Sequence, residues 1–265
     1  MTEYAKDYTI DELMAVVLAK ELKDGDLGMP TAMCPLGDTA ICLAKRTHAK
    51  GLIWYAHNGW DPDFEYNLDT IHDLNRVTRT GVFIPDWGDI LSQMLRGMVG
   101  FQIVAPAQID KYGNLNNNVI GEPASPRVRL PGSVGMPEIA CFHKRVLVYE
   151  PRHDTRTFVD KVDFISGLGQ IPGGAKARRE KRIIGGGPVI VVSNLAVMDF
   201  DEQTGLMRVK SLHPGVQLEE VQANTGFNLV LPDQIPETEA PTQEQVDLIR
   251  IKIDPHGQRR HRMYT

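Results

Sequence analysis

The chain has 265 residues, 42% of them hydrophobic, and a formal net charge of −5. This length allows a sizeable core in one or two domains, and the negative charge argues against nucleic-acid binding, which needs a basic face. No run approaches the ~18 apolar residues of a membrane-spanning helix. Residues 1–7 lack the basic and apolar regions of a signal peptide. The three cysteines form no CxxC pair, which suits a reducing cytoplasm, and no metal or nucleotide-triphosphate motif is present.

Helices and strands alternate along the first part of the chain. Thr9 and Glu12 predict a capping box, and the helix that they start is interrupted by the segment 25–30. Further elements are predicted from apolar periodicity. They are helices at 35–45 and 89–96 and strands at 51–56 and 98–107.

The second part continues the same alternation. Strands are predicted at 144–150 and 187–193, and Thr242 with Gln245 predicts the cap of a last helix that runs through Lys252. The basic tail at 259–262 is expected to be frayed. With no internal repeat or linker, the sequence predicts an α/β fold with residues 1–265 as a single domain.

Three segments read as irregular, at 58–89, 123–137 and 170–187, because they are rich in glycine, proline or polar residues. Loops of this length in a compact domain are functional or covered by a partner, or they are variable surface. Both interpretations stay open for each segment.

The most informative stretch is 105–116 (APAQIDKYGNLN). A buried strand ends in a polar turn where Gly113 can take a positive φ, and Asn114 and Asn116 follow two residues apart. Amides at a strand end are typical of ligand sites in open α/β sheets. The alternative is an ordinary hairpin with asparagine-rich turn chemistry.

This stretch resembles a segment of the B subunit of family I CoA-transferases, the glutaconate CoA-transferase type. Further segments resemble that protein in the same order, and the similarity covers nearly the whole chain. They are 160–169 (DKVDFISGLG), 192–200 (VSNLAVMDF), 213–216 (HPGV), 224–227 (NTGF) and 253–255 (IDP).

The resemblance implies an open α/β sheet of the NagB/RpiA/CoA-transferase-like type, an acyl-CoA substrate and a separate A subunit as partner. It also implies a nucleophilic glutamate at the end of a strand, which attacks the thioester. The matching stretch here is 52–59 (LIWYAHNG), which places His57 or Ala56 at that position. Neither residue is a carboxylate, so simple CoA transfer is not favoured.

His57 and Asn58 are therefore the predicted catalytic residues of this strand end. Histidine titrates near neutrality and can activate water, which favours hydrolysis of a thioester or of a carbon–carbon bond. Relatives with an altered glutamate include ring-cleaving hydrolases and a decarboxylase. The alternatives are a loop histidine without chemistry, a nearby carboxylate (Asp61, Asp63 or Glu65), or a B subunit that only scaffolds its partner.

The remaining site predictions follow the same resemblance. Gly132 and Gly135 belong to a loop like the family's G-S-x-G element, whose backbone N–H groups can face an oxyanion; a tight turn is the alternative. Binding residues for CoA are predicted at Gln108, Asn114, Asn116 and Ser133. Arg178 and Arg179, in a basic run, are predicted to hold CoA phosphates unless the run is a solvated surface.

The cysteines are interpreted as small buried or partly buried residues rather than nucleophiles. Cys34 is singled out because it precedes a helix start, where the pKa of a thiol is lowered. No metal is expected.

Overall fold

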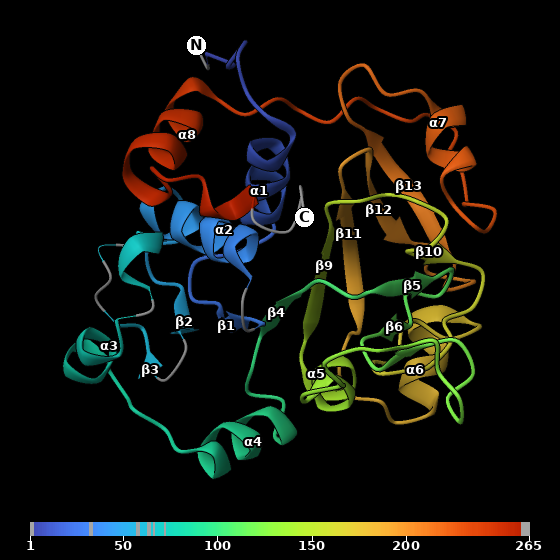
Figure 1. Ribbon diagram of the computed structural model, residues 1–265, viewed down its shortest axis with the longest axis horizontal. Helices are drawn as coiled ribbons and strands as arrows, with labels where there is room; N and C mark the ends of the chain where they lie inside the picture. Colours follow the sequence, from blue (N-terminus) through green and yellow to red (C-terminus); the bar gives the residue numbers. More distant parts are fainter. Residues whose placement is uncertain are drawn as a thin grey trace. The chain divides into compact units, whose positions relative to one another are not determined.

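The computed structural model describes residues 3–31, 34–56, 59–62, 65, 67–71 and 73–260. The chain divides into two compact units. The first unit takes Met1–Gln93, Met98–Val104 and Glu239–Thr265, and the second takes Met94–Gly97 and Ala105–Thr238. Each unit contains both helices and strands (Figure 1), so the predicted α/β class is confirmed. That the chain folds as one domain stays a prediction.

The first unit is built on four strands in the order β4-β1-β2-β3. They span Phe101–Val104, Leu27–Pro30, Ile53–Ala56 and Gly59–Trp60. Strand β1 pairs in parallel with both β2 and β4, whereas β2 and β3 are antiparallel. The carboxyl ends of β1, β2 and β4 therefore lie at one edge, where open α/β sheets bind ligands.

Strand β1 corrects the prediction that 25–30 only interrupts the first helix. Gly28 pairs with Trp54 on one side and Phe101 on the other. A Cβ on Gly28 would collide with the Phe101 ring, so only glycine fits this close approach. The strand exists because distant segments pack around it, which local propensity does not reveal.

The helices of the first unit follow the sequence closely at the predicted caps. Glu12 accepts the Thr9 N–H at 2.9 Å at the start of α1, and Gln245 accepts the Thr242 N–H at 2.9 Å before α8. The elements are α1 (Ile10–Lys20), α2 (Pro35–Arg46), α3 (Leu74–Thr80), α4 (Trp87–Leu95), which leads into the second unit, and α8 (Gln243–Asp247), with 3₁₀ turns η1 (Leu68–Thr70) and η3 (Gln258–Arg260) and the π-helical η2 (Leu248–Ile253).

Segments from near the two ends of the chain, with α1 in blue and α8 in red, lie side by side in this unit (Figure 1), and Tyr4 forms a bridge with Thr242. Arg259 is 3% exposed and forms ion pairs with Asp11 at 2.6 Å, Glu12 at 2.9 Å and Asp254 at 2.9 Å. The prediction of a frayed tail is therefore wrong at Arg259. Its partners are carboxylates that only the folded chain brings together, which a local reading of the tail cannot show.

The second unit carries the remaining strands, which form three sheets. Strand β9 is parallel to β11, and β12 and β13 continue this sheet antiparallel. A small sheet has the order β10-β5-β6, and β7 pairs with β8. The strands are β5 (Gln108–Asp110), β6 (Leu115–Asn116), β7 (Val119–Ile120), β8 (Val128–Arg129), β9 (Arg145–Glu150), β10 (Phe158–Val159), β11 (Pro188–Ser193), β12 (Ala196–Phe200) and β13 (Met207–Leu212), with helices α5 (Met136–Phe142), α6 (Gly174–Glu180) and α7 (Leu218–Ala223).

Two of the segments predicted as irregular contain helices. Lys176, Arg178 and Arg179 of the basic run lie in α6, which follows Gly173 in the left-handed region, and Lys181 and Arg182 come after its end. The segment 58–89 contains η1 and α3, and the Asp73 side chain caps α3 by accepting two backbone N–H groups at 3.1 Å. These short helices depend on caps within polar, glycine-rich sequence, so apolar periodicity missed them.

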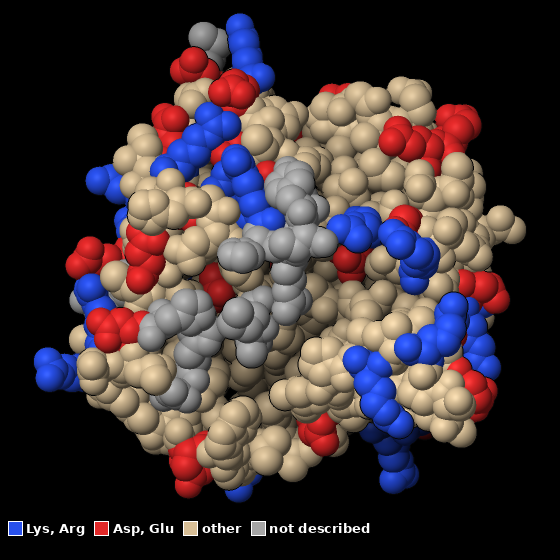
Figure 2. Space-filling view, in the orientation of Figure 1, with Lys and Arg blue, Asp and Glu red and all other residues tan. Residues whose placement is uncertain are grey.

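Charged side chains are spread over the surface. Figure 2 shows Lys and Arg interspersed with Asp and Glu on the face in view, without a large field of one sign. Among the described residues, no helix is long and apolar enough to cross a membrane.

Candidate functional site

The end of β2 is the position at which the resemblance implies a nucleophile. Ala56 is the last residue of β2, pairs with Gly59 and is 1% exposed. The strand expected at 51–56 is thus present and ends where it was predicted to end. His57 and Asn58, the predicted catalytic residues, lie outside the described residues.

Asp61, Asp63 and Glu65, which follow this strand, were expected to lie on one side of an extended segment, but the two that the structure describes are not in extended backbone. Asp61 and Glu65 have φ values of 45° and 54°, which are left-handed. Asp61 pairs with the buried Lys45 at 2.6 Å, and Glu65 pairs with Arg76 at 2.9 Å. Asp63 lies outside the described residues. Both described carboxylates therefore already neutralise a basic side chain.

The polar side chains of the β5–β6 hairpin form hydrogen bonds with one another and with neighbouring segments. Asn116 donates to the Gln108 side-chain oxygen at 2.7 Å and to the Val119 carbonyl at 2.7 Å. The Gln108 side-chain amide donates to the Asp163 carboxylate at 3.1 Å, and the Asp163 backbone N–H donates to the Gln108 side-chain oxygen at 3.1 Å. Since Gln108 and Asn116 are buried, these amides hold β5, β6 and the 160–169 segment together.

Asn114 has a similar role in the turn. Its side-chain amide donates to the Asp110 carboxylate at 2.9 Å, and its oxygen accepts the Gly169 N–H at 2.8 Å. The Asp110 carboxylate also accepts the Tyr112 N–H at 3.0 Å. Burial raises the pKa of Asp110, and the hydrogen bonds from Asn114 oppose that rise. Gly113 has φ +73°, as the predicted turn requires.

The predicted glycine loop is fixed to the segment after β6. Leu130 N–H donates to the Asn118 carbonyl at 2.9 Å, and Gly132 N–H donates to the Asn117 carbonyl at 2.8 Å. Ser133 Oγ donates to Asn118 Oδ1 at 2.6 Å. A Cβ on Gly132 would meet nothing within 4 Å, so the loop has open space at that glycine.

Positive φ values cluster in this loop. Gly132 has φ +111°, Val134 has +38° and Gly135 has +76°. Gly135 precedes α5, and a Cβ there would lie 3.5 Å from the Met94 side chain. Glycine suits two of these positions, whereas valine is disfavoured in the left-handed region.

The two arginines of the basic run differ. Arg178 is 2% exposed and donates to the carbonyls of Gly169, Ala140 at 2.8 Å and Gly185 at 2.9 Å. Burial lowers the pKa of its guanidinium. Arg178 therefore holds the 169–187 segment. That it binds CoA phosphates stays a prediction, and its burial argues against it. Arg179 is exposed on α6.

A buried network that the sequence did not reveal joins three of the family-like segments. His153 contacts Ser193 Oγ through Nδ1 at 2.8 Å and Thr225 Oγ1 through Nε2 at 3.0 Å. Its backbone N–H donates to the Asn194 side chain at 2.8 Å, and its ring stacks on Phe158 at 3.8 Å. Burial lowers the pKa of His153 to about 4, so the ring is neutral near pH 7.

A second histidine extends this network. His213 Nε2 contacts the Ser193 carbonyl at 2.8 Å, and Nδ1 contacts Thr238 Oγ1 at 3.0 Å. Burial lowers its pKa to about 4 as well. The segments 192–200, 213–216 and 224–227 thus meet in one buried network and stabilise the second unit. The only signal in the sequence was the presence of Ser193, His213 and Thr225 in these segments, which does not show that their side chains meet.

The cysteines match their interpretation as buried or partly buried residues. Cys34 and Cys42 are fully buried, Cys141 is partly exposed, and all three are free thiols. Burial raises the pKa of Cys141 and of Cys42. In the part of the chain that the structure describes, no group of three His, Cys, Asp or Glu residues could hold a metal ion.

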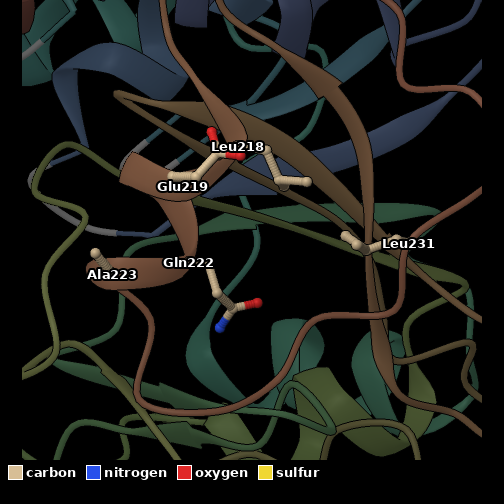
Figure 3. Close-up of a pocket in the computed structure, with 5 residues that line it drawn as sticks. All are labelled: Leu218, Glu219, Gln222, Ala223 and Leu231. Carbon is tan, nitrogen blue, oxygen red and sulfur yellow. The ribbon is translucent and has the colours of Figure 1, made fainter.

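One hollow lies in the second unit, at α7, with a volume of about 390 Å³ (Figure 3). Figure 3 shows Leu218 and Glu219 at the start of α7, with Leu231 on another segment. The Gln222 side chain donates to the Phe227 carbonyl at 2.7 Å, so it supports the adjacent turn. None of the predicted site residues lines this hollow.

Another hollow, of about 230 Å³, lies in the first unit. Leu27 and Ile53, the first residues of β1 and β2, place it at the amino ends of the strands, away from Ala56. Its lining is mostly apolar and consists of Leu27, Ile53, Trp60, Asp61, Val82, Phe83, Gln93 and Met98.

Comparisons with known proteins agree with this architecture and with the family-like segments. A family model described as Coenzyme A transferase matches residues 73–224, more than half of the chain. The chain is 34% identical to the B subunit of 3-oxoadipate CoA-transferase of Pseudomonas knackmussii, over 92% of each chain. It is 33% identical to the cholesterol ring-cleaving hydrolase IpdB subunit of Mycobacterium bovis, over 94% of this chain and 96% of that one.

A solved structure extends the similarity to three dimensions. Glutaconate coenzyme A-transferase of Acidaminococcus fermentans superposes with a TM-score of 0.81 at 28% identity, covering 96% of this chain and 97% of that one. The fold and the comparisons thus define a chain of the CoA-transferase type. The protein belongs to the coenzyme A transferase family, in which it is a B-type subunit with both transferase and hydrolase relatives.

Proposed function

We propose that this chain is the B subunit of a two-chain enzyme that acts on an acyl-CoA thioester and uses water, rather than an enzyme carboxylate, as the attacking group. The observation that carries the proposal is Ala56 at the end of β2, followed by His57, where the resemblance implies a glutamate. Alanine cannot form an acyl adduct. The ion pairs of Asp61 with Lys45 and of Glu65 with Arg76 argue against either as a substitute nucleophile.

The proposed reaction balances with water and the thioester alone. His57 takes a proton from water as the water oxygen forms a bond to the thioester carbonyl carbon. The carbon–sulfur bond then breaks, and the proton passes to the leaving sulfur, which gives a carboxylic acid and free CoA. In a β-dicarbonyl acyl-CoA, the same activated water can instead add to the ketone carbon. The carbon–carbon bond then breaks, its electron pair leaves as the thioester enolate, and the proton passes from His57 to the enolate carbon, which gives a carboxylic acid and a shortened acyl-CoA. The similarity to the ring-cleaving IpdB subunit supports this second bond as a candidate.

The glycine loop is the proposed site for the thioester oxygen. Gly132 and Gly135 carry no side chain, and the space beside the Gly132 α-carbon is open. The Gly132 N–H already donates to the Asn117 carbonyl at 2.8 Å, so the Gly135 N–H is the proposed donor and Gly132 leaves room for the ligand. A backbone N–H that is fixed before the reaction stabilises a developing oxyanion because it needs no reorganisation. Ser133 donates to Asn118, so we assign it to holding the loop rather than to holding CoA.

CoA phosphates are proposed to contact Arg179 and its basic neighbours. Arg179, Lys181 and Arg182 are exposed, and Lys176 pairs only distantly with Glu180, at 3.9 Å. A guanidinium fork suits phosphate oxygens. Because Gln108, Asn114 and Asn116 form hydrogen bonds within the protein, we assign them to holding the hairpin in shape rather than to binding CoA directly.

An A-type subunit is proposed as the partner. Relatives of this chain are named as B subunits, and the first unit exposes Val82 at 79% and Trp87 at 73%, beside Phe83 and Leu91. Exposed apolar clusters of this kind mark protein contacts. We therefore expect the A-type subunit to cover this surface.

The proposal is tested with the assembled complex. The chain is purified alone and with a candidate A-type subunit, and the mass in solution shows whether a heteromer forms. The complex is then given acyl-CoA with and without an acceptor carboxylic acid. We expect the acyl-CoA to be consumed at the same rate in both cases, with free CoA as the product if the thioester is cleaved and a shortened acyl-CoA if the carbon–carbon bond is cleaved. A reaction that requires the acceptor would identify a transferase, and a chain that remains a monomer would contradict the heteromer.

CoA transfer is the second candidate, favoured by the similarity to the B subunit of 3-oxoadipate CoA-transferase. It would require a carboxylate from the A-type subunit or from another place in this chain. A complex with no turnover on any acyl-CoA, but normal assembly, would instead indicate a scaffolding role.

A further inference from the structure

Val134 is a conformational outlier with an exposed side chain. It lies in the glycine loop at φ +38° and is 76% exposed. A β-branched residue is strongly disfavoured in this region, where glycine or asparagine would be comfortable. An exposed apolar side chain also gains nothing from burial in the chain itself. The local conformation therefore works against folding, which points to a role outside folding.

Hydrogen bonds hold the loop in place on both sides of Val134. On one side, Gly132 N–H donates to the Asn117 carbonyl at 2.8 Å, and Ser133 Oγ donates to Asn118 Oδ1 at 2.6 Å. On the other side, Met136 N–H closes a turn onto the Ser133 carbonyl at 2.8 Å. These bonds hold both neighbours of Val134, so its strained backbone is imposed by the surrounding structure.

A second segment is bound to the same acceptor. Ser166 Oγ also donates to Asn118 Oδ1 at 2.6 Å, which brings the 164–167 segment beside the loop. A Cβ on Gly167 would lie 2.7 Å from Met136 Cγ, so the two segments are in close contact. Ile165, next to Ser166, is 51% exposed. The loop and the family-like 160–169 segment thus form one supported platform that carries exposed apolar side chains.

We propose that Val134 contacts the apolar part of the acyl-CoA next to the thioester and positions it over the loop. This rests on the proposed function, in which Gly132, before Val134, leaves room for the ligand and the N–H of Gly135, after Val134, faces the thioester oxygen. A side chain between them would meet the carbon chain adjoining that oxygen. The supported, strained backbone keeps the side chain in place before the ligand arrives, which reduces the ordering needed on binding.

The test uses the assembled complex and the substitution Val134→Gly. Glycine accepts a positive φ, so the thermal midpoint should stay the same or rise. The dissociation constant for the acyl-CoA should increase about tenfold through the lost apolar contact, while that for free CoA should change much less. Ile184→Gly is the matched control, because Ile184 is also β-branched, in a loop of the second unit and 65% exposed, but without a positive φ. It should leave the dissociation constant unchanged.

Each other outcome overturns a defined part of the account. Unchanged acyl-CoA binding by Val134→Gly, with a parent complex that binds, overturns the role of Val134 and leaves the proposed function standing. Loss of assembly with the A-type subunit would make Val134 a contact between the two chains and also overturn the proposal. A lower thermal midpoint would contradict the strained conformation. A parent complex that binds no acyl-CoA overturns the proposed function and, with it, this inference.

Discussion

The β5–β6 hairpin and the end of β2 both resemble the CoA-transferase family, with opposite consequences. In the hairpin the family-like residues are present, and Gln108, Asn114 and Asn116 use their amides to hold neighbouring backbone and carboxylates. At the end of β2 the expected glutamate is missing, and Ala56 stands at the strand end. The hydrogen bonds of the hairpin residues thus support the architecture, and we propose that the departure at β2 determines which reaction this architecture can support.

The buried histidine network belongs with the hairpin in this comparison. His153, Ser193, His213 and Thr225 come from separate family-like segments and meet inside the second unit. The family-like segments that supply this network therefore identify the fold, but they do not identify the reaction. Stability measurements therefore test the architectural side, and rate and binding measurements test the chemical side.

Acid should destabilise the second unit through its buried histidines. Burial lowers the pKa of His143, His153 and His213 to about 4 in the folded chain, from an unfolded value near 6.5. Because the unfolded state binds these protons more tightly, stability is complete above about pH 6.5 and is lost as the pH falls towards 4. Each histidine should cost about 2 kcal/mol between pH 7.5 and pH 5, measured by urea unfolding at these two pH values.

His143→Leu sharpens this test. Both ring nitrogens of His143 are buried, and neither has a hydrogen-bond partner among the described residues, so an apolar side chain should be tolerated at pH 7.5. The variant should lose its share of the acid sensitivity. The exposed His256 supplies the control, and His256→Asn should behave like the parent. Equal parent stability at the two pH values would contradict the neutral buried state.

Replacing Arg178 should destabilise the fold. Arg178→Ala removes the donors of three buried carbonyl groups and leaves a cavity, which should cost about 3–5 kcal/mol. Arg179→Ala, one residue along the same helix but exposed, should change stability by less than about 0.5 kcal/mol. Chemical unfolding of the two variants measures the difference. A mild effect at Arg178 would reopen it as a ligand residue.

His57→Ala tests the chemical side of the comparison. If His57 activates water, the variant should lose about 10²–10⁴-fold in rate, with little change in acyl-CoA binding. The parent pH–rate profile should show a limb near neutrality that the variant lacks. His256→Ala should leave both unchanged. An intact rate would favour the alternative register, in which Ala56 alone occupies the nucleophile's place, and would direct the search to the A-type subunit.

Arg179→Ala should have the smallest effect. Loss of one exposed phosphate contact should raise the dissociation constant of CoA about 3- to 10-fold at low salt, less at high salt because exposed charges are screened. Dephospho-CoA, which lacks the 3′-phosphate, shows which phosphate is involved. If Arg179 contacts the 3′-phosphate, Arg179→Ala should not change the dissociation constant of dephospho-CoA. An unchanged constant for both ligands would remove the basic helix from the CoA site.

Sequence predicted best where the cause of a structure is local. The capping boxes of Thr9 with Glu12 and of Thr242 with Gln245 are set within one turn, and both helices begin where they were expected. The turn at Gly113 was likewise predicted from its own residues. Strand β1 and the burial of Arg259 depend on partners far along the chain, so local patterns did not predict them.

The candidate site stays a prediction, and the contacts of its residues were predicted poorly. The resemblance located the glycine loop and the hairpin, yet it could not show that Arg178 is buried while Arg179 is exposed, because adjacent residues differ only through tertiary packing. The hydrogen bonds of His153 with Ser193 and Thr225 were missed for the same reason. Which acyl group is bound depends on the shape of the pocket, which no motif records.

Chemical trapping tests the central claim, that no glutamate of this chain serves as nucleophile, most directly. The assembled complex is incubated with acyl-CoA in the presence of hydroxylamine or borohydride, and its peptides are analysed by mass spectrometry. A glutamyl anhydride or thioester would be captured as a modified glutamate. The account predicts that acyl-CoA is consumed while every glutamate of this chain stays unmodified. Stoichiometric labelling of one of them, such as Glu65, would contradict it and identify a CoA-transferase.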